Sequence, residues 1–201
     1  MEVKTIKKNS TAEIVEKKSR FIANVFYVET VEKAEEYIKK IKKQYHDAKH
    51  NCFAYIVSDL NGNVVQKSND DGEPSGTAGG PMLKILTGQN LTNILVIVTR
   101  YFGGILLGTG GLVRAYSGAT TEALNKAEYV QKSIGYEVNL QVLYKDIEKL
   151  KYELEKNKIK IIKIEYNENV EISIEIPEEK IDLLEKINVE TQNSTKKYVE
   201  I

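Results

Sequence analysis

The chain has 201 residues, 41% of them hydrophobic, and its 29 basic residues balance 29 acidic ones. This composition is sufficient to bury one or two cores, and it excludes a largely disordered chain. The zero net charge argues against a general polyanion binder. The longest apolar run, residues 94–99, is far shorter than the roughly 20 residues of a membrane span. Because the N-terminus also leads into no signal-peptide core, we expect a cytoplasmic protein with no membrane partner.

The first 134 residues predict an α+β domain that opens with strands. A helix follows over about residues 31–45, where Thr30 can cap the N-terminus and Glu32 in the first turn suits the helix dipole. Two further strands form a hairpin around the Asn-Gly-Asn turn at 61–63. The segments expected to be strands are 2–6, 12–17, 20–28, 52–57 and 64–68.

A glycine-rich loop over residues 70–80 precedes the most apolar segment of the chain. Residues 94–99, ILVIVT, are apolar on both faces, which is typical of a central strand. A helix is predicted over 111–128, and its Ala and Gly residues form a side that can approach a sheet closely. The single cysteine, Cys52, lies in an apolar strand, so we expect a buried structural thiol and not a nucleophile.

Glycine usage changes sharply along the chain. Eleven of the 13 glycines lie within residues 72–118, and none follows Gly135. The segment after Gly135 is rich in Ile, Lys and Glu. Since composition and periodicity both change near this glycine, we predict two domains, residues 1–134 and 135–201, each with its own core.

The second domain predicts the element order β-α-β-β-α-β. A helix with Ile147, Leu150 and Leu154 on one face separates the first two strands, and Pro177 suits the first turn of a second helix. This order is the ferredoxin-like pattern, an antiparallel sheet with two helices on one face. The expected strands are 136–142, 159–166, 169–176 and 196–201.

The glycine-rich stretch 99–118, TRYFGGILLGTGGLVRAYSG, has some of the spacing of two known phosphate-binding loops but fits neither. Gly103 and Gly108 are spaced as in a P-loop, but Thr109 stands where the phosphate-gripping lysine belongs. A dinucleotide fingerprint needs a third glycine, and Val113 occupies that position. We therefore expect no nucleotide cofactor and no measurable hydrolysis of ATP or GTP.

An anion site at the start of the helix is a different hypothesis for this stretch. A helix beginning near Gly110 exposes backbone N–H groups, which attract anions together with the helix dipole. The chain has 26 lysines and only three arginines, and two of these, Arg100 and Arg114, flank the glycine run. A guanidinium fork suits phosphate or carboxylate in a way that a lysine does not. The alternative is that the glycines only permit tight packing.

The charge distribution permits a phosphate-bearing partner for the first domain. Residues before Glu137 carry 18 basic and 14 acidic side chains, whereas those from Glu137 onward carry 11 basic and 15 acidic ones. The first domain is therefore mildly basic. The candidate anion- or RNA-binding residues are Arg100, Tyr101, Gly103, Gly104, Gly108, Gly110, Gly111, Arg114 and Tyr116.

The loop at 70–80 supplies a supporting polar cluster. Its acidic residues are either ion-pair partners of the arginines or metal ligands, and ion pairing is favoured because no metal-binding spacing accompanies them. His50 is an acid–base candidate, although a hydrogen-bonding histidine is the more frequent case. We assign no catalytic residue and no metal ligand. The cluster comprises His50, Asp70, Asp71, Glu73 and Thr77.

Three blocks of the sequence resemble the signature of the IMPACT family and its bacterial YigZ/YvyE-like branch: AKHNCFAY (48–55), DDGEPSGTAGGPML (70–83) and TRYFGGILLGTGGLVRAYS (99–117). The resemblance implies a first β-α-β domain similar to the fourth domain of elongation factor G and to a ribosomal-protein domain. It implies a ferredoxin-like second domain similar to the fifth domain of that factor. It also implies a cytosolic protein connected with translation or its regulation, with RNA, the ribosome or a translation factor as partner.

Two classes of function remain open at this stage. In the first, the protein is a non-enzymatic binding module whose glycine stretch contacts RNA phosphates or a ribosomal partner. In the second, it is a small enzyme or ligand-binding protein acting on a phosphorylated or nucleotide-like molecule, with His50 as acid–base group and Asp71 and Glu73 as carboxylates. We favour the first class, because no nucleophile–base pair or metal set can be assembled from the sequence.

Overall fold

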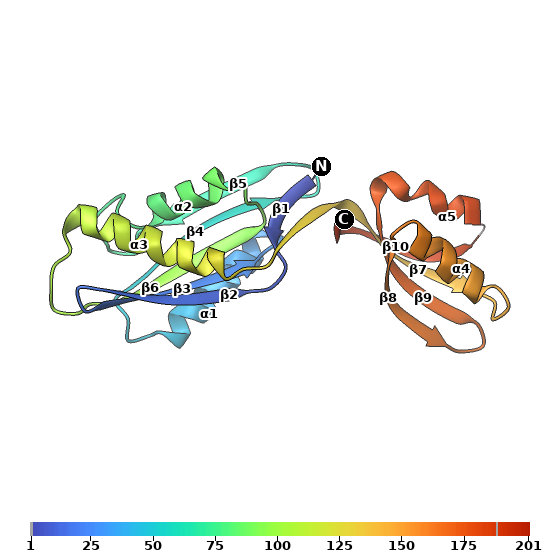
Figure 1. Cartoon of the computed structure of the whole chain (residues 1–201), viewed down its shortest axis with the longest axis horizontal. Coiled ribbons are helices and arrows are strands. Elements are labelled where there is room, and N and C mark those ends of the chain that lie inside the picture. Colours follow the sequence, from blue (N-terminus) through green and yellow to red (C-terminus); the bar gives the residue numbers. More distant parts are fainter. Residues whose placement is uncertain (1, 188) are drawn as a thin grey trace. The chain divides into compact units, whose positions relative to one another are not determined.

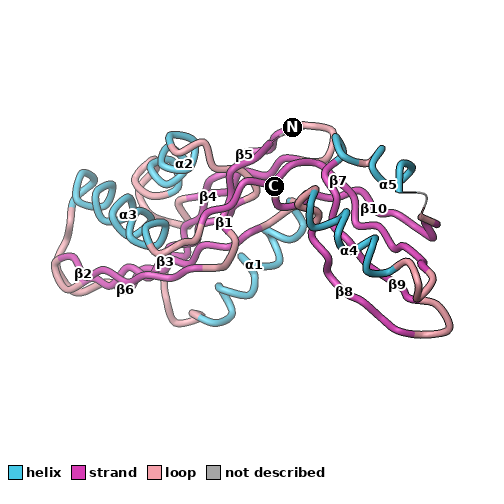
Figure 2. The backbone as a smooth tube through the Cα atoms, turned by 45° about the vertical axis from the view of Figure 1, so that its right-hand side comes forward, coloured by secondary structure: helices cyan, strands magenta, loops and turns pink. Residues whose placement is uncertain are grey.

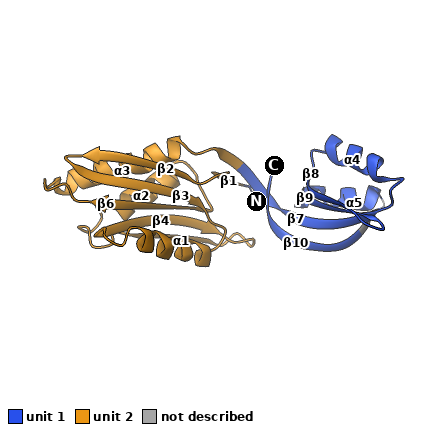
Figure 3. Ribbon diagram, turned by 90° about the horizontal axis from the view of Figure 1, so that it is seen from below, with its two compact units in different colours: residues 1–2, 131–201 blue, residues 3–130 orange. Residues whose placement is uncertain are grey.

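The structure is a computed structural model that describes residues 2–187 and 189–201. It divides into two compact units, shown in orange and blue in Figure 3. The N-terminal unit comprises Val3–Val130, and the C-terminal unit comprises Gln131–Ile201 together with Glu2. The change of unit follows Val130, whereas the sequence predicts it after residue 134; Gly135 lies inside the strand β7 (Tyr129–Val142).

The N-terminal unit is built on a five-stranded antiparallel sheet with the order β2-β3-β6-β4-β5. Its middle strand is apolar on both faces: Val96 and Val98 belong to one buried cluster, and Leu95 and Ile97 belong to another. The prediction of a central strand at this position is confirmed. The strands are β2 (Ser10–Glu16), β3 (Ser19–Tyr27), β6 (Ile94–Tyr101), β4 (His50–Ser58) and β5 (Val64–Asn69).

Helices cover both faces of this sheet (Figures 1 and 2). One face packs against α1 (Val31–Gln44), and the predicted cap of this helix is confirmed, because Thr30 Oγ1 accepts a hydrogen bond from Lys33 N at 3.1 Å. The other face packs against α2 (Gly79–Gly88) and α3 (Gly108–Asn125). Helix α2 is absent from the sequence prediction, which extends the glycine-rich loop to residue 80. Helix α3 begins three residues before its predicted start.

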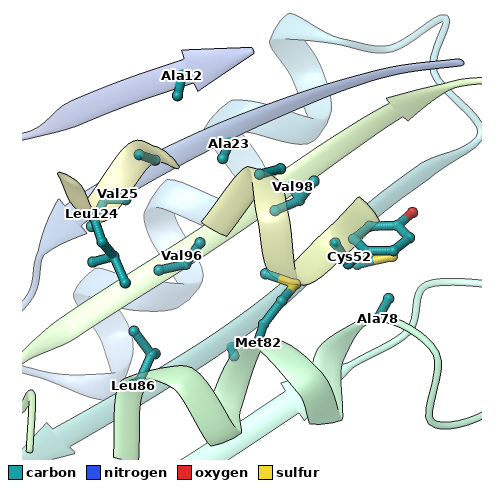
Figure 4. Close-up of a cluster of buried hydrophobic side chains, with 14 of the residues drawn as sticks. Ala12, Ala23, Val25, Cys52, Ala78, Met82, Leu86, Val96, Val98 and Leu124 are labelled. Carbon is teal, nitrogen blue, oxygen red and sulfur yellow. The ribbon is translucent and has the colours of Figure 1, made fainter. Parts of the chain in front are cut away.

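The core under α2 and α3 combines large residues of α2 with small residues of α3. Met82 and Leu86 project from α2 over Val96 and Val98 of the sheet (Figure 4). On α3 three of the seven buried residues are alanines (Ala115, Ala119 and Ala123), which allow the helix axis to lie close to the strands. This close packing fixes the start of α3 relative to the end of β6.

The C-terminal unit has the element order β-α-β-β-α-β, with a short 3₁₀ turn (Glu178–Lys180) before the second helix. Its strands are antiparallel in the order β10-β7-β9-β8. The strand β1 (Glu2–Ile6) lies almost wholly in the N-terminal unit, where Ile6 is part of the core. Alternate residues of β7 and β9 pack against both helices. No helix in the described parts of the chain is long and apolar enough to cross a membrane. The remaining elements are α4 (Ile147–Lys156), β8 (Lys160–Tyr166), β9 (Val170–Pro177), α5 (Asp182–Ile187) and β10 (Glu190–Glu200).

Candidate anion-binding and nucleic-acid interface

The three sequence blocks meet at one end of the N-terminal sheet. In the antiparallel register, His50 at the start of β4 lies opposite Arg100 near the end of β6, and Arg20 at the start of β3 lies opposite Tyr101. The strand β5 also ends here, at Asn69. Two segments therefore leave the sheet at the same end. We call residues 70–78 the acidic loop and residues 102–111 the glycine turn.

Arg100 is buried beneath α3 and is paired with an acid. Its side chain is 8% exposed, and its Nη1 donates a hydrogen bond to Glu73 Oε1 at 2.6 Å. The same carboxylate oxygen accepts a hydrogen bond from the hydroxyl of Tyr116 at 2.8 Å. The guanidinium also lies 5.5 Å from the ring centre of Phe21, and its Nε is buried with no hydrogen-bond partner among the described residues. Of the residues predicted to bind an anion or RNA, Arg100 and Tyr116 therefore lie in the core.

Asp70 closes the N-terminus of α2. Its Oδ1 accepts hydrogen bonds from the backbone N–H groups of Ala78 and Gly79 at 3.0 and 2.9 Å, and its Oδ2 accepts one from Gly76 at 2.8 Å. A carboxylate in this position satisfies donors that a helix start leaves unpaired, and it complements the dipole. Asp70 thus supplies the negative charge at the N-terminus of α2. Its partners are backbone N–H groups, whereas the sequence predicts an arginine.

Asp71 and His50 hold the acidic loop to the edge of the sheet. The carboxylate of Asp71 pairs with Lys42 Nζ at 2.6 Å and accepts a hydrogen bond from the backbone N–H of Asn51 at 2.7 Å. His50 Nδ1 lies 2.9 Å from the carbonyl oxygen of Asp71, so this nitrogen carries the proton and donates it. The ion-pairing hypothesis expects arginine partners for all three acids, but among them only Glu73 pairs with an arginine.

The side chains of Thr77 and Cys52 also hold the acidic loop through hydrogen bonds to its backbone carbonyl groups. Thr77 is buried, and its hydroxyl donates a hydrogen bond to the carbonyl of Pro74 at 2.6 Å. The Cys52 thiol donates to the carbonyl of Asp70 at 2.9 Å, and burial raises the pKa of this thiol to about 12. The thiol is consequently protonated near neutral pH and is a poor nucleophile. Among the described residues, no group of three or more His, Cys, Asp or Glu side chains is placed to hold a metal ion.

Tyr101 lies on the opposite face of the sheet from Arg100. Its hydroxyl donates a hydrogen bond to Asp47 Oδ1 at 2.7 Å, and the guanidinium of Arg20 lies 5.6 Å from its ring centre. Alternation along β6 places these two neighbours on different faces. Tyr101 is therefore separated from α3 by the sheet, which the sequence motif alone does not reveal.

Close packing fixes the beginning of the glycine turn. The backbone N–H of Gly103 donates to Ser19 Oγ at 3.1 Å, and a Cβ on Gly103 would lie only 2.0 Å from the carbonyl carbon of Lys18. Only glycine fits this contact with the hairpin between β2 and β3. Gly104 and Gly108 adopt positive φ, and a Cβ on Gly111 would lie only 2.9 Å from the Cβ of Leu107. Gly110 has ordinary φ, and a Cβ there would meet only the Arg114 side chain, at 3.7 Å. Packing or backbone conformation therefore accounts for these glycines except Gly110.

The first turn of α3 has exposed N–H groups and no anion of its own. Leu107 occupies the N-cap position without a capping hydrogen bond, and the first turn contains no acidic residue. The Nη1 atom of Arg114 lies 3.7 Å from the position that a Cβ on Gly110 would take, so the guanidinium lies beside this turn. Arg114 is exposed and has no hydrogen-bond or ion-pair partner in the part of the chain that the structure describes. The predicted residues Gly108 and Gly110 are exposed here, and Gly111 is partly exposed.

Several exposed residues around the turn were not singled out from the sequence. Phe102 is 55% exposed and Leu106 is 82% exposed, and Ile105 between them is also exposed. Lys17 and Lys18 form the two-residue turn of the adjacent hairpin, and both have positive φ. The only sequence signal for the tip of this hairpin is the gap between the expected strands 12–17 and 20–28. Nothing in the sequence distinguishes an exposed Phe102 from a buried one.

Comparison with known proteins gives two matches to family models. One model, described as the Impact N-terminal domain, matches residues 17–124, which include all three blocks. The other, described as a domain of unknown function (DUF1949), matches residues 140–186. The two matches lie in different units of the structure.

Individual proteins match over nearly the whole chain. The IMPACT family member YvyE of Bacillus subtilis is 41% identical over 189 residues, which cover 94% of this chain and 86% of that protein. The family member YigZ of Escherichia coli is 37% identical over 82% of this chain and 81% of that protein. A solved crystal structure of a hypothetical protein is 32% identical, with 94% and 96% of the two chains covered and a TM-score of 0.64.

Proposed function

The chain belongs to the IMPACT family, and we propose that it is a non-enzymatic cytosolic protein that takes part in translational regulation by binding RNA, free or within the ribosome. The contact is made by the first turn of α3 and Arg114, which bind RNA phosphates. The link with translation rests on the family to which the chain belongs. The choice of RNA rests on the chemistry of this end of the N-terminal unit.

The observation that carries the proposal is the unsatisfied start of α3. Its exposed N–H groups and dipole attract an anion, and the guanidinium of Arg114 lies beside Gly110 without an acidic partner among the described residues. A guanidinium in this position can bind two phosphate oxygens at once. The hairpin between β2 and β3 contacts Gly103 at the start of the turn, and its Lys17 and Lys18 add positive charge to this end of the unit.

The alternative of an enzyme acting on a phosphorylated molecule has less support. Of its proposed groups, Glu73 is buried and paired with Arg100, and Asp71 is engaged by Lys42. His50 donates its Nδ1 proton to a backbone carbonyl. These residues hold the acidic loop in place, which leaves none of the three in the position of an open catalytic group.

The finer architecture is part of the same proposal. We infer that the C-terminal unit is ferredoxin-like, which its β-α-β-β-α-β order and its strand order β10-β7-β9-β8 support. We also infer that the N-terminal unit is related to the fourth domain of elongation factor G and to a ribosomal-protein domain. A family of translation-linked proteins built from such domains is consistent with an RNA surface at the end of the first sheet.

The test compares two exposed arginines. The substitution Arg114→Lys keeps the positive charge but removes the planar guanidinium that can bind two phosphate oxygens. The binding free energy for a fluorescently labelled single-stranded RNA should weaken by about 1–3 kcal/mol, with little change in melting temperature. Arg20→Lys is the matched control, because Arg20 is exposed but forms two hydrogen bonds with Glu13. An Arg114→Lys variant that melts early yet binds RNA normally would falsify the proposal. Co-sedimentation of the same variants with ribosomal subunits tests the link with translation.

A further inference from the structure

We propose that Phe102 is a stacking platform for an unpaired nucleobase, placed beside the phosphate-binding turn of α3. This inference rests on the proposed function and deepens it, because it assigns single-stranded RNA, in preference to duplex RNA, as the ligand of this surface. Unpaired bases are commonly bound by stacking on aromatic side chains, whereas bases inside a duplex are not available for stacking.

The ring of Phe102 is supported from the core. It is 55% exposed, and the guanidinium carbon of Arg100 lies 5.6 Å from its ring centre. That guanidinium is held by Glu73, which is itself held by the hydroxyl of Tyr116. The attraction between a cation and an aromatic ring is stronger when the cation is shielded from water, as the Arg100 guanidinium is. The hydrogen bond of the guanidinium with Glu73 fixes its position relative to the ring. The buried ion pair therefore has a positioning role in addition to its structural one.

The backbone beside Phe102 is also fixed. Gly103 is pressed against Lys18, and its N–H group donates to Ser19 in the β2–β3 hairpin. On the other side, Phe102 follows directly from the hydrogen-bonded end of β6 at Tyr101. A ring held on both sides along the chain loses little conformational freedom when a base stacks on it, which favours binding.

The platform and the phosphate site occupy two ends of the same glycine turn. Phe102 begins the turn, and the exposed N–H groups of Gly108 to Gly110 end it. A nucleic-acid strand offers a base and phosphates close together, so it can use both ends. The cations nearby are Lys17 and Lys18 of the hairpin and Arg114 of α3.

A protein partner is the competing explanation, because Ile105 and Leu106 expose aliphatic side chains on the same turn. The residues of the turn favour RNA. The aromatic ring is backed by a cation, and the first turn of α3 has no acidic residue. If an apolar protein surface were the partner, Leu106, at 82% exposure, would contribute at least as much as Phe102.

The experiment uses the full chain and three labelled RNA probes of equal length: a single strand, a duplex, and a strand whose central nucleotides are abasic. Fluorescence anisotropy at one fixed salt concentration gives the affinities. Wild type should bind the single strand more tightly than either other probe. Phe102→Ala should weaken single-strand binding about tenfold, or about 1.4 kcal/mol, and should bind the abasic strand as wild type does. Phe102→Tyr should retain wild-type affinity, and Leu106→Ala is the matched exposed control with no effect.

The possible outcomes separate this inference from the proposed function. Equal binding of normal and abasic strands, with Phe102→Ala unchanged and Arg114→Lys still weakened, overturns the platform but not the phosphate site. No binding of any RNA by wild type overturns both. An equal loss with Leu106→Ala shows that general apolar contact, and not stacking on the aromatic ring, contributes to RNA binding, and it overturns the platform. Phe102→Leu provides a second variant that keeps apolar bulk without an aromatic face; full affinity in this variant also overturns it.

Discussion

Helices α2 and α3 both begin in glycine-rich segments and pack on the same face of the sheet, but their first turns have opposite electrostatic environments. At α2, the carboxylate of Asp70 accepts hydrogen bonds from the backbone N–H groups of Ala78 and Gly79. At α3, neither a side-chain cap nor an acidic residue is present in the first turn. The start of α2 is thus paired with a carboxylate, whereas the start of α3 has no side-chain acceptor among the described residues.

The same difference extends to the two segments as a whole. Each acid of the acidic loop has a partner within the unit: backbone amides for Asp70, Lys42 for Asp71, and Arg100 for Glu73. In the glycine turn, by contrast, Phe102 and Leu106 are exposed. We therefore expect substitutions in the acidic loop to change the free energy of unfolding, and substitutions at Phe102 and in the first turn of α3 to change binding.

The largest expected effect is on stability, from Glu73→Ala. Removing this carboxylate leaves the buried guanidinium of Arg100 without its ion pair, which should lower the free energy of unfolding by about 3–5 kcal/mol in a denaturant titration. The control is Glu36→Ala, which removes an exposed helix pair with Lys33 and should cost less than about 0.5 kcal/mol. A Glu73→Ala variant as stable as wild type would show that the acidic loop is not held by this pair.

A smaller loss of stability is expected from Asp70→Ala. This change removes the acceptor for the N–H groups at the start of α2 and for Gly76, so the free energy of unfolding should fall by about 1–2 kcal/mol. Asp70→Asn keeps one acceptor oxygen and should lose less. Thermal unfolding followed by circular dichroism measures both. If Asp70→Ala reduced RNA affinity and left stability unchanged, the contrast between the two helix starts would be wrong.

The regular elements of the fold could be predicted from the sequence because their burial follows a period. The face of α1 with Ala34, Ile38 and Ile41 repeats at helical spacing, and Thr30 supplies a recognisable cap. Helix α2 could not be predicted in this way, because Gly79, Gly80 and Pro81 have low helix propensity. Tertiary packing determines that segment: a Cβ on Gly79 would lie 2.7 Å from the backbone nitrogen of Asn69.

The candidate site could be located from the sequence, but the roles of its residues could not. The motif around Arg100 and Arg114 identifies the region in which we propose the site, whereas only the structure shows that Arg100 is buried and Arg114 is exposed. Which face of β6 carries Arg100 depends on the register with β3 and β4, a long-range property. The exposure of Phe102 likewise depends on how the turn leaves the sheet, and no local pattern encodes it.

The hairpin beside the glycine turn offers a test in which stability and binding should change in opposite directions. Lys17 and Lys18 have φ values of 46° and 65°, in a two-residue turn where Asn-Gly is the preferred sequence. The double change Lys17→Asn with Lys18→Gly should raise the free energy of unfolding by about 1 kcal/mol by relieving this strain. If these lysines contact phosphates, RNA affinity and its dependence on salt should both decrease.

The control for this double change is Lys39→Gln with Lys40→Gln on α1, where both lysines are exposed and the net charge changes equally. It should relieve no strain and should lower RNA affinity less. An Asn-Gly hairpin variant with the RNA affinity of this control would place the hairpin outside the interface, while leaving the stability prediction intact.

The smallest expected change in stability comes from supplying α3 with the anion that α2 already has. Thr109 is exposed in the first turn of α3, and Thr109→Asp introduces a carboxylate beside the unpaired N–H groups. The free energy of unfolding should rise by about 0.3–1 kcal/mol through the helix dipole. RNA affinity should fall, because the new carboxylate competes with phosphate for the same donors and repels it. Thr109→Asn, which has no charge, should keep most of the affinity. A Thr109→Asp variant that gains stability and binds RNA as wild type would mean that the open start of α3 is not where the phosphate binds.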